Sequence, residues 1–166
     1  MTIRTDTNPH AAAGHRDEFL KVRMVPQPDD VTCGPTSLYA VYDFLGRPVD
    51  LTRLIERVDN LPSGGTMAVF LGIDALQRGL SAKIYSYDLK VFDPSWKGLG
   101  SVQITDKLQA QLKYKKGKRF TASSDAYMEF IALGGQLVFE DLTPDLLDQI
   151  FDLELPILVG LNATYL

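Results

Sequence analysis

The stretch VPQPDDVTCGPTSL, residues 25–38, joins a polar loop to the start of a helix and holds the only cysteine of the chain. Prolines and aspartates interrupt regular structure over residues 26–30, so this part predicts a loop. A helix is expected to begin at Cys33, because Pro35 suits a first helical turn, where a missing N–H costs nothing. The next apolar residues recur at helical spacing, and Gly46 is a natural stop. These apolar residues are Leu38, Val41, Tyr42 and Leu45.

Cys33 is expected to be reactive because of its place at the start of this amphipathic helix. Free backbone N–H groups and the positive end of the helix dipole favour the thiolate, which is the nucleophilic form. Gly34 is interpreted as leaving room for a substrate backbone to approach the sulfur. Gln27 lies six residues upstream, and its amide can donate to the oxyanion formed when a thiolate attacks a carbonyl. The alternatives are a structural cysteine and a solvated loop glutamine.

The rest of the chain predicts an α+β fold, because helices dominate the first half and strands the second. Asp50 and Thr66 are expected to cap the second and third helices, the third of which ends at Arg78 before Gly79. Thr143, followed by Pro144, is expected to cap the last helix. Helices are also expected over 104–116 and 124–133, and strands over 19–25, 81–88, 137–139 and 156–161.

Residues 1–18 are small and polar, which predicts a disordered tail. Residues 19–166 are enough for one domain and too few for two ordinary ones. His10 and His15 fall in the predicted tail and are expected to be solvated. Two histidines do not make a structural zinc site, because such a site needs four ligands. No metal and no cofactor are expected.

Composition and charge exclude several classes of function. The formal net charge of −4 and the pI of about 5.1 argue against a general nucleic-acid binder. No apolar run approaches the roughly 20 residues needed to span a bilayer, so no membrane partner is expected. One cysteine allows no intramolecular disulfide, and the first residues do not form a secretory signal. A cytoplasmic location is therefore expected.

The loop glutamine and the Cys-Gly-Pro helix start resemble the opening motif of the C39-like peptidases, in the papain-like superfamily of cysteine peptidases. A looser resemblance continues through Gly64-Gly65-Thr66 and the following helix, and through residues 156–162. The resemblance implies a papain-like fold, in which a helical part carrying the nucleophile packs on an antiparallel sheet. It also implies that Cys33 is the nucleophile, that Gln27 supplies an oxyanion donor and that residues 63–66 border the groove. A peptide or amide is the implied substrate.

The catalytic histidine is the point where this sequence departs from the family. In the family, the histidine and the Asp or Asn that orients it come after the segment that residues 156–162 resemble, and no histidine follows Cys33 here. We therefore expect residues 19–166 to be the N-terminal part of the peptidase domain, without its C-terminal strands and inactive by itself. Three functions stay open: a cysteine peptidase with a thioester on Cys33, a non-catalytic peptide-binding module, and an acyl or glutamyl transferase. The sequence does not indicate the oligomeric state.

Overall fold

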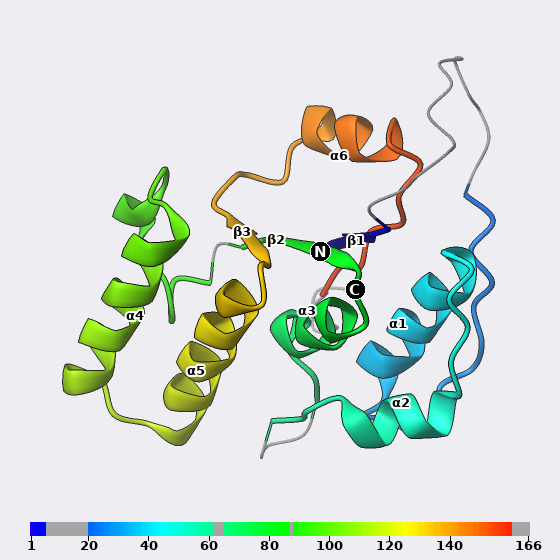
Figure 1. The fold of residues 1–166 in the computed structure, drawn as a ribbon, viewed down its shortest axis with the longest axis horizontal. Coiled ribbons are helices and arrows are strands. Elements are labelled where there is room, and N and C mark those ends of the chain that lie inside the picture. The colour runs from blue at the N-terminus through cyan, green and yellow to red at the C-terminus, as the bar shows by residue number, and fades with distance from the viewer. Residues whose placement is uncertain (6–19, 62–64, 87, 161–166) are drawn as a thin grey trace.

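The computed structural model describes residues 1–5, 20–61, 65–86 and 88–160 (Figure 1). Within these residues the protein is α+β, with six α-helices, one 3-10 helix and three short strands. In chain order these are β1 (Thr2–Arg4), α1 (Cys33–Phe44), α2 (Leu51–Arg57), α3 (Ala68–Gln77), β2 (Ser81–Tyr85), η1 (Pro94–Trp96), α4 (Ser101–Tyr114), α5 (Lys118–Ala132), β3 (Gln136–Val138) and α6 (Pro144–Phe151).

The sheet is mixed, whereas the resemblance implied an antiparallel one. Its order is β1-β2-β3, with β1 antiparallel and β3 parallel to β2. The parallel pair arises because the chain crosses over through α4 and α5 between β2 and β3. Ile3 pairs with Ala82, and both are buried together with Ile84. Because side chains alternate along a strand, Ser81, Lys83 and Tyr85 of β2 lie on the other face.

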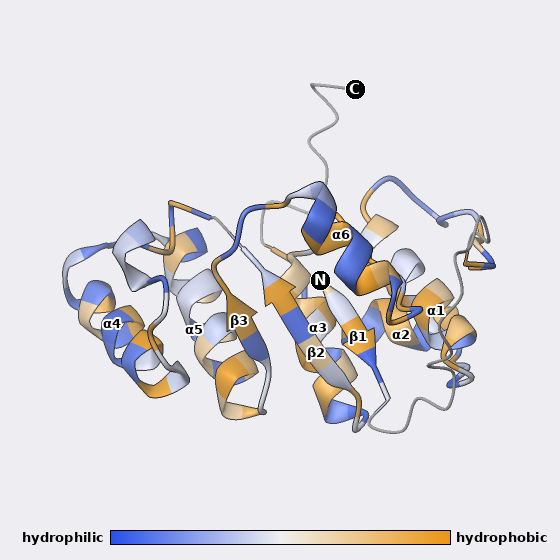
Figure 2. Ribbon diagram, turned by 90° about the horizontal axis from the view of Figure 1, so that it is seen from above, coloured by the Kyte–Doolittle hydropathy of each residue, from blue (hydrophilic) through white to orange (hydrophobic). Residues whose placement is uncertain are grey.

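Helices α1 to α5 form a layer on the buried face of this sheet (Figures 1 and 2). The central helix is α3, which packs against β2, α5 and α1, while α4 packs on α5 and α2 packs on α1. The helix that carries Cys33 therefore packs chiefly on two other helices rather than on the sheet. On the opposite side of the sheet, α6 buries Leu146 and Ile150 against Tyr85 and Ile157.

The turns that end α1 and α3 share one geometry. Gly46 and Gly79 adopt left-handed conformations, with φ of 67° and 75°, which glycine tolerates without steric cost. The N–H of each following residue, Arg47 or Leu80, donates to the carbonyl five positions earlier, at 2.8 and 3.0 Å. Both glycines were expected as helix stops, and both predictions are confirmed.

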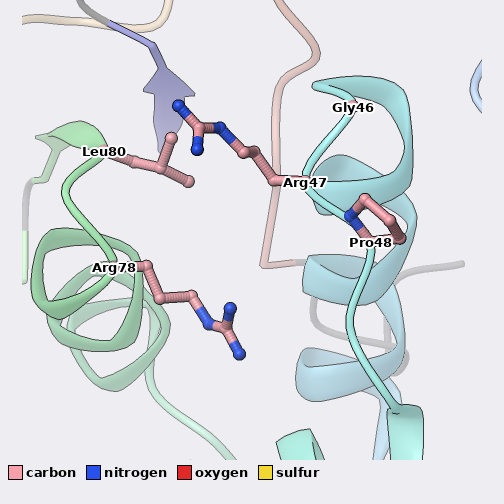
Figure 3. Close-up of a pocket in the computed structure, with 5 residues that line it drawn as sticks. All are labelled: Gly46, Arg47, Pro48, Arg78 and Leu80. Carbon is pink, nitrogen blue, oxygen red and sulfur yellow. The ribbon is translucent and has the colours of Figure 1, made fainter.

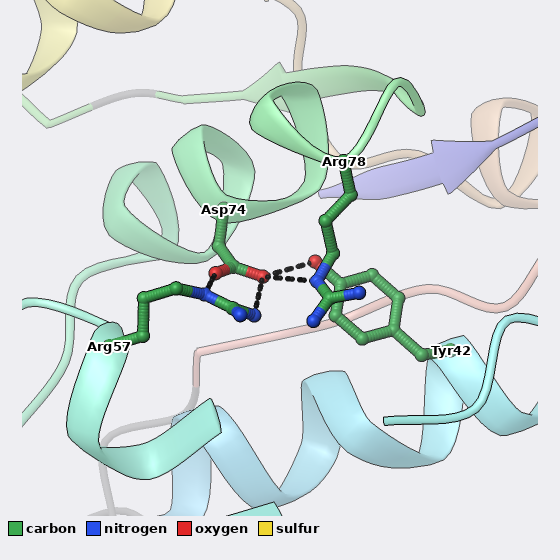
Figure 4. A network of polar contacts seen from close by, with 4 residues as sticks. All are labelled: Tyr42, Arg57, Asp74 and Arg78. Carbon is green, nitrogen blue, oxygen red and sulfur yellow. Dashed lines mark hydrogen bonds and ion pairs between the residues drawn. The ribbon is translucent and has the colours of Figure 1, made fainter. Parts of the chain in front are cut away.

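A buried carboxylate joins the first three helices (Figure 4). Asp74, in the middle of α3, is 3% exposed. It accepts a hydrogen bond of 2.6 Å from the hydroxyl of Tyr42 on α1, and two from the guanidinium of Arg57 on α2. Arg78 approaches the same carboxylate, with Nε 3.4 Å from Oδ1. Burial raises the pKa of Tyr42, and the hydrogen bond to Asp74 raises it further, so the hydroxyl keeps the proton that it donates.

The start of the chain is ordered, which corrects part of the predicted tail. Thr2–Arg4 form β1, and Met1 and Ile3 are 7% and 1% exposed. The α-amino group of Met1 donates to the carbonyl of Leu158 at 2.8 Å, and the N–H of Leu158 donates back at 2.9 Å. The tail was predicted from average composition, which hides two apolar residues with a partner far along the chain. His10 and His15 lie outside the described residues.

Two predicted strands are wrong. Residues 20–25 have no regular structure and no partner strand, and none of their side chains is fully buried. Residues 156–160 make only one bridge, from Ile157 to Thr2, and Val159 is 54% exposed. The continuous apolar run at residues 156–161 predicts a strand buried on both faces. In the structure only β1 lies beside its described part. Phe19 and Leu161, at the ends of the two predictions, lie outside the described residues.

Local helix caps follow the sequence more closely. The side chain of Asp50 accepts the N–H of Arg53 at 2.9 Å, and Thr143 accepts that of Leu146 at 3.2 Å, as predicted. Thr66 does not cap α3: the helix begins two residues later, and the Thr66 hydroxyl donates to the Asn60 side chain at 2.7 Å instead.

The buried α-amino group of Met1 predicts a stability change near neutral pH. Burial lowers its pKa from 8.0 to about 6, so the folded protein holds this proton less tightly than the unfolded chain. The free energy of unfolding therefore keeps the full contribution of this amino group above pH 8 and loses it as the pH falls through 6. We expect the free energy of unfolding to fall by about 2 kcal/mol between pH 8 and pH 6.

Urea unfolding at pH 6, 7 and 8 measures this change. N-terminal acetylation is the control, because it keeps an N–H for Leu158 and removes the titrating amine. Equal pH dependence of the acetylated and free proteins would contradict the assignment, since both share every other titrating group.

Candidate active site at the start of α1

Cys33 is the first residue of α1, and it is exposed. The preceding loop is shaped by Asp29, whose carboxylate accepts the N–H of Val31 at 2.9 Å and whose carbonyl accepts the hydroxyl of Thr32 at 3.3 Å. Asp29 therefore caps this loop. Thr32 directs its hydroxyl backwards into the loop and does not cap α1. The backbone N–H groups at the start of α1 that have no partner within the helix therefore lie at the same helix end as the Cys33 sulfur.

Gly34 has a different role from the one that the sequence indicated. A Cβ built on Gly34 would lie 2.9 Å from the Cβ of Thr66, closer than side chains normally approach. The space beside Gly34 is therefore filled by Thr66, just before α3, rather than left for a substrate. Thr66 is fixed by its hydrogen bond to Asn60, and the carbonyl of Gly65 accepts the N–H of Leu61 at 3.0 Å.

Two of the four residues that the resemblance implied as a groove border, Gly65 and Thr66, lie next to the start of α1. The packing of Thr66 on Gly34 brings the residues before α3 next to the helix turn that begins with Cys33. Residues 62–64, which include the other half of that predicted border, lie outside the described residues.

Gln27 is exposed on the loop, and no hydrogen bond joins it to Cys33. Within the described part of the chain, its side chain makes no hydrogen bond to any other residue either. None of the described residues therefore holds this amide away from the start of α1.

An exposed apolar residue near Cys33 was not predicted from the sequence. Val31, two residues before Cys33, is 51% exposed, and Met24 on the same loop is exposed as well. The signal was present as isolated apolar residues on either side of a polar loop, but Met24 was placed in a strand that does not form. Val31 gives the surface near Cys33 an apolar part.

The described residues provide an exposed thiol and exposed amide groups but no histidine to act as a base. Among them there is no histidine, and no group of three or more His, Cys, Asp or Glu side chains could hold a metal ion. No helix among these residues is both long and apolar enough to cross a bilayer. A thiol has the chemistry to attack a carbonyl, but amide cleavage also needs proton transfers that a histidine usually supplies.

Comparison of the chain with known protein families, with curated proteins and with solved structures finds no match.

The close approach of Gly34 and Thr66 predicts the effect of adding one methyl group. Gly34→Ala should destabilise the protein by about 1–3 kcal/mol, the usual cost of overpacking. Helix propensity alone predicts the opposite sign, since alanine is favoured over glycine by about 1 kcal/mol within a helix. Thr66→Gly removes the opposing Cβ, so Gly34→Ala should be neutral or stabilising in that background. Urea unfolding of the two single variants and the double variant measures this, and a stabilising Gly34→Ala in the parent chain would refute the contact.

Proposed function

We propose that this chain carries the nucleophilic part of a cysteine-dependent enzyme of the C39-like peptidase kind, which cleaves a peptide or amide bond through a thioester on Cys33. One observation carries the proposal: the only cysteine of the chain is exposed as the first residue of a 12-residue helix. A thiolate there is stabilised by the helix dipole and by unpaired backbone N–H groups. A structural cysteine would instead be expected among the buried residues.

Bond cleavage would proceed in two steps. The Cys33 thiolate attacks the carbonyl carbon, and the resulting oxyanion is held by the backbone N–H of Cys33 and the side-chain amide of Gln27. Collapse of this intermediate expels the amine, which takes up a proton, and leaves the acyl group on sulfur. Water then adds to the thioester carbonyl and loses a proton, which releases the acid and restores the thiolate.

Both steps need a group that moves protons, and the resemblance assigns this role to a histidine after residues 156–162. No histidine follows Cys33 in these 166 residues. We therefore expect this chain to accept an acyl group from an activated donor, whose leaving group needs no proton, much faster than it cleaves an amide.

A non-catalytic peptide-binding module is the second candidate, and the lack of a histidine after Cys33 favours it. The two candidates differ in what they require of the sulfur. An enzyme needs a thiolate that forms an acyl adduct, whereas a binding module needs only the surface around it. Transfer of the acyl group to an amine instead of water would identify the third function, an acyltransferase.

Acylation by 4-nitrophenyl acetate, followed by intact-protein mass spectrometry, tests the proposal. We expect one acetyl adduct that Cys33→Ala abolishes. A thiol moved to an exposed position in the middle of α4, in Cys33→Ala/Gln109→Cys, should acylate at least about tenfold more slowly at pH 7, because it lacks the helix start. Equal rates for the two thiols would count against an activated Cys33. Added imidazole should speed loss of the adduct by supplying a base.

The same assay isolates the role of Gln27. Gln27→Ala should slow acylation by about a hundredfold, the scale for losing one oxyanion donor. Gln77→Ala, at the other end of α3 from Thr66, is the matched control and should stay within about twofold. An unchanged rate in Gln27→Ala would remove Gln27 from the mechanism and leave the role of Cys33 intact.

A further inference from the structure

A hollow of about 300 Å³ lies between the turn that ends α1 and the turn that ends α3 (Figure 3). Five residues line it: Gly46, Arg47, Pro48, Arg78 and Leu80. Both walls are fixed, because each turn is closed by a left-handed glycine and by a hydrogen bond to the carbonyl five positions back. The volume is at the lower end of the range for small-molecule sites, which suits a ligand the size of one ring or smaller.

The two arginines give the hollow its chemistry. Figure 3 shows Arg47 extending from its turn across to Leu80 and Arg78 extending into the space between the turns, with Pro48 and Leu80 on opposite sides. None of the lining residues is acidic. The walls therefore combine two cationic groups with two apolar side chains.

The two arginines differ in how far they are already paired. Arg78 shares Asp74 with Arg57, and its guanidinium also lies 5.2 Å from the centre of the Tyr42 ring. This pairing holds Arg78 in position through Nε and leaves its other N–H groups for a ligand. Within the described part of the chain, the Arg47 side chain has no hydrogen-bond or ion-pair partner.

Among the residues that line the hollow or pair with its lining, three guanidinium groups accompany one carboxylate. Arg57 and Arg78 share the single carboxylate of Asp74, and Arg47 adds a third guanidinium beside them. Guanidinium groups bind carboxylates and phosphates through paired N–H donors, and such charge-assisted bonds are stronger than neutral ones.

We propose that this hollow binds a small oxyanion ligand, a phosphate or carboxylate attached to a small apolar group. Arg47 and Arg78 hold the oxyanion, and Pro48 and Leu80 contact the apolar group. The hollow lies at the end of α1 opposite to Cys33, so it is separate from the candidate active site.

An NMR titration with three probes that carry the same ring tests the proposal: phenyl phosphate, benzoate and neutral benzyl alcohol. The ionic strength is held at about 0.1 M, where exposed charges are screened beyond about 10 Å. We expect saturable shifts of the Gly46 and Leu80 amide signals with the anions and not with the alcohol. The anion with the lower Kd identifies which oxyanion the hollow prefers. Equal binding of the alcohol, or no saturable shift with any probe, would overturn the proposal.

Arg47 is the residue to change, because its side chain makes no hydrogen bond or ion pair with the other described residues and Asp74 keeps its partners without it. Arg47→Gln should raise the Kd of the preferred anion at least about tenfold. Arg53→Gln, at an exposed position of α2, is the matched control and should leave the Kd of the anion within about twofold. Arg47→Gln should also leave the acylation rate of Cys33 unchanged, so the two proposals fail independently. An unchanged Kd in Arg47→Gln would show that the hollow is not the binding site.

Discussion

The carboxylate of Asp74 is the constraint on which the arrangement of the helices depends. A buried, unpaired carboxylate costs several kcal/mol, so α3 can occupy the centre of the molecule only if donors surround this group. Tyr42 brings α1 to it and Arg57 brings α2, while Arg78 closes the third side from α3 itself. The guanidinium groups are partly exposed, so water reduces the stability gained from their ion pairs. Tyr42 is fully buried, and among the described residues its hydroxyl hydrogen-bonds only to Asp74.

The opposite side of α3 is held by shape instead of charge. A Cβ on Gly72 would lie 2.7 Å from the ring of Phe130 on α5, and a Cβ on Gly135 would lie 2.4 Å from the same ring. Phe130 is fully buried between these two glycines. The central helix is therefore fixed by an ionic contact on one side and by close apolar packing on the other. This fixes α1, and with it the position of Cys33, relative to the sheet.

The parts that the sequence predicted are those whose causes are local. The caps at Asp50 and Thr143 and the stop at Gly46 depend on hydrogen bonds and backbone angles within a few residues. The start of α1 at Cys33 follows from the same kind of signal. The strand at Thr2–Arg4 and the missing strand at 20–25 depend instead on whether a distant partner exists, which alternation of side chains does not reveal. For the same reason the packing of Thr66 on Gly34, 32 residues apart, and the donors of Asp74 appeared only in the structure.

A double-mutant cycle between Tyr42 and Asp74, measured by urea unfolding, tests most directly whether the Asp74 carboxylate holds α1 to α3. If the buried carboxylate holds α1 to α3, Tyr42→Phe should cost about 1.5–3 kcal/mol in the parent protein, as for a hydrogen bond to a charged group. In the Asp74→Ala background the same change should be neutral or stabilising, because the hydroxyl is then buried without a partner. We expect a coupling energy between Tyr42 and Asp74 of at least about 1.5 kcal/mol. Effects that add within about 0.5 kcal/mol would contradict it and would show that α1 is held by other contacts.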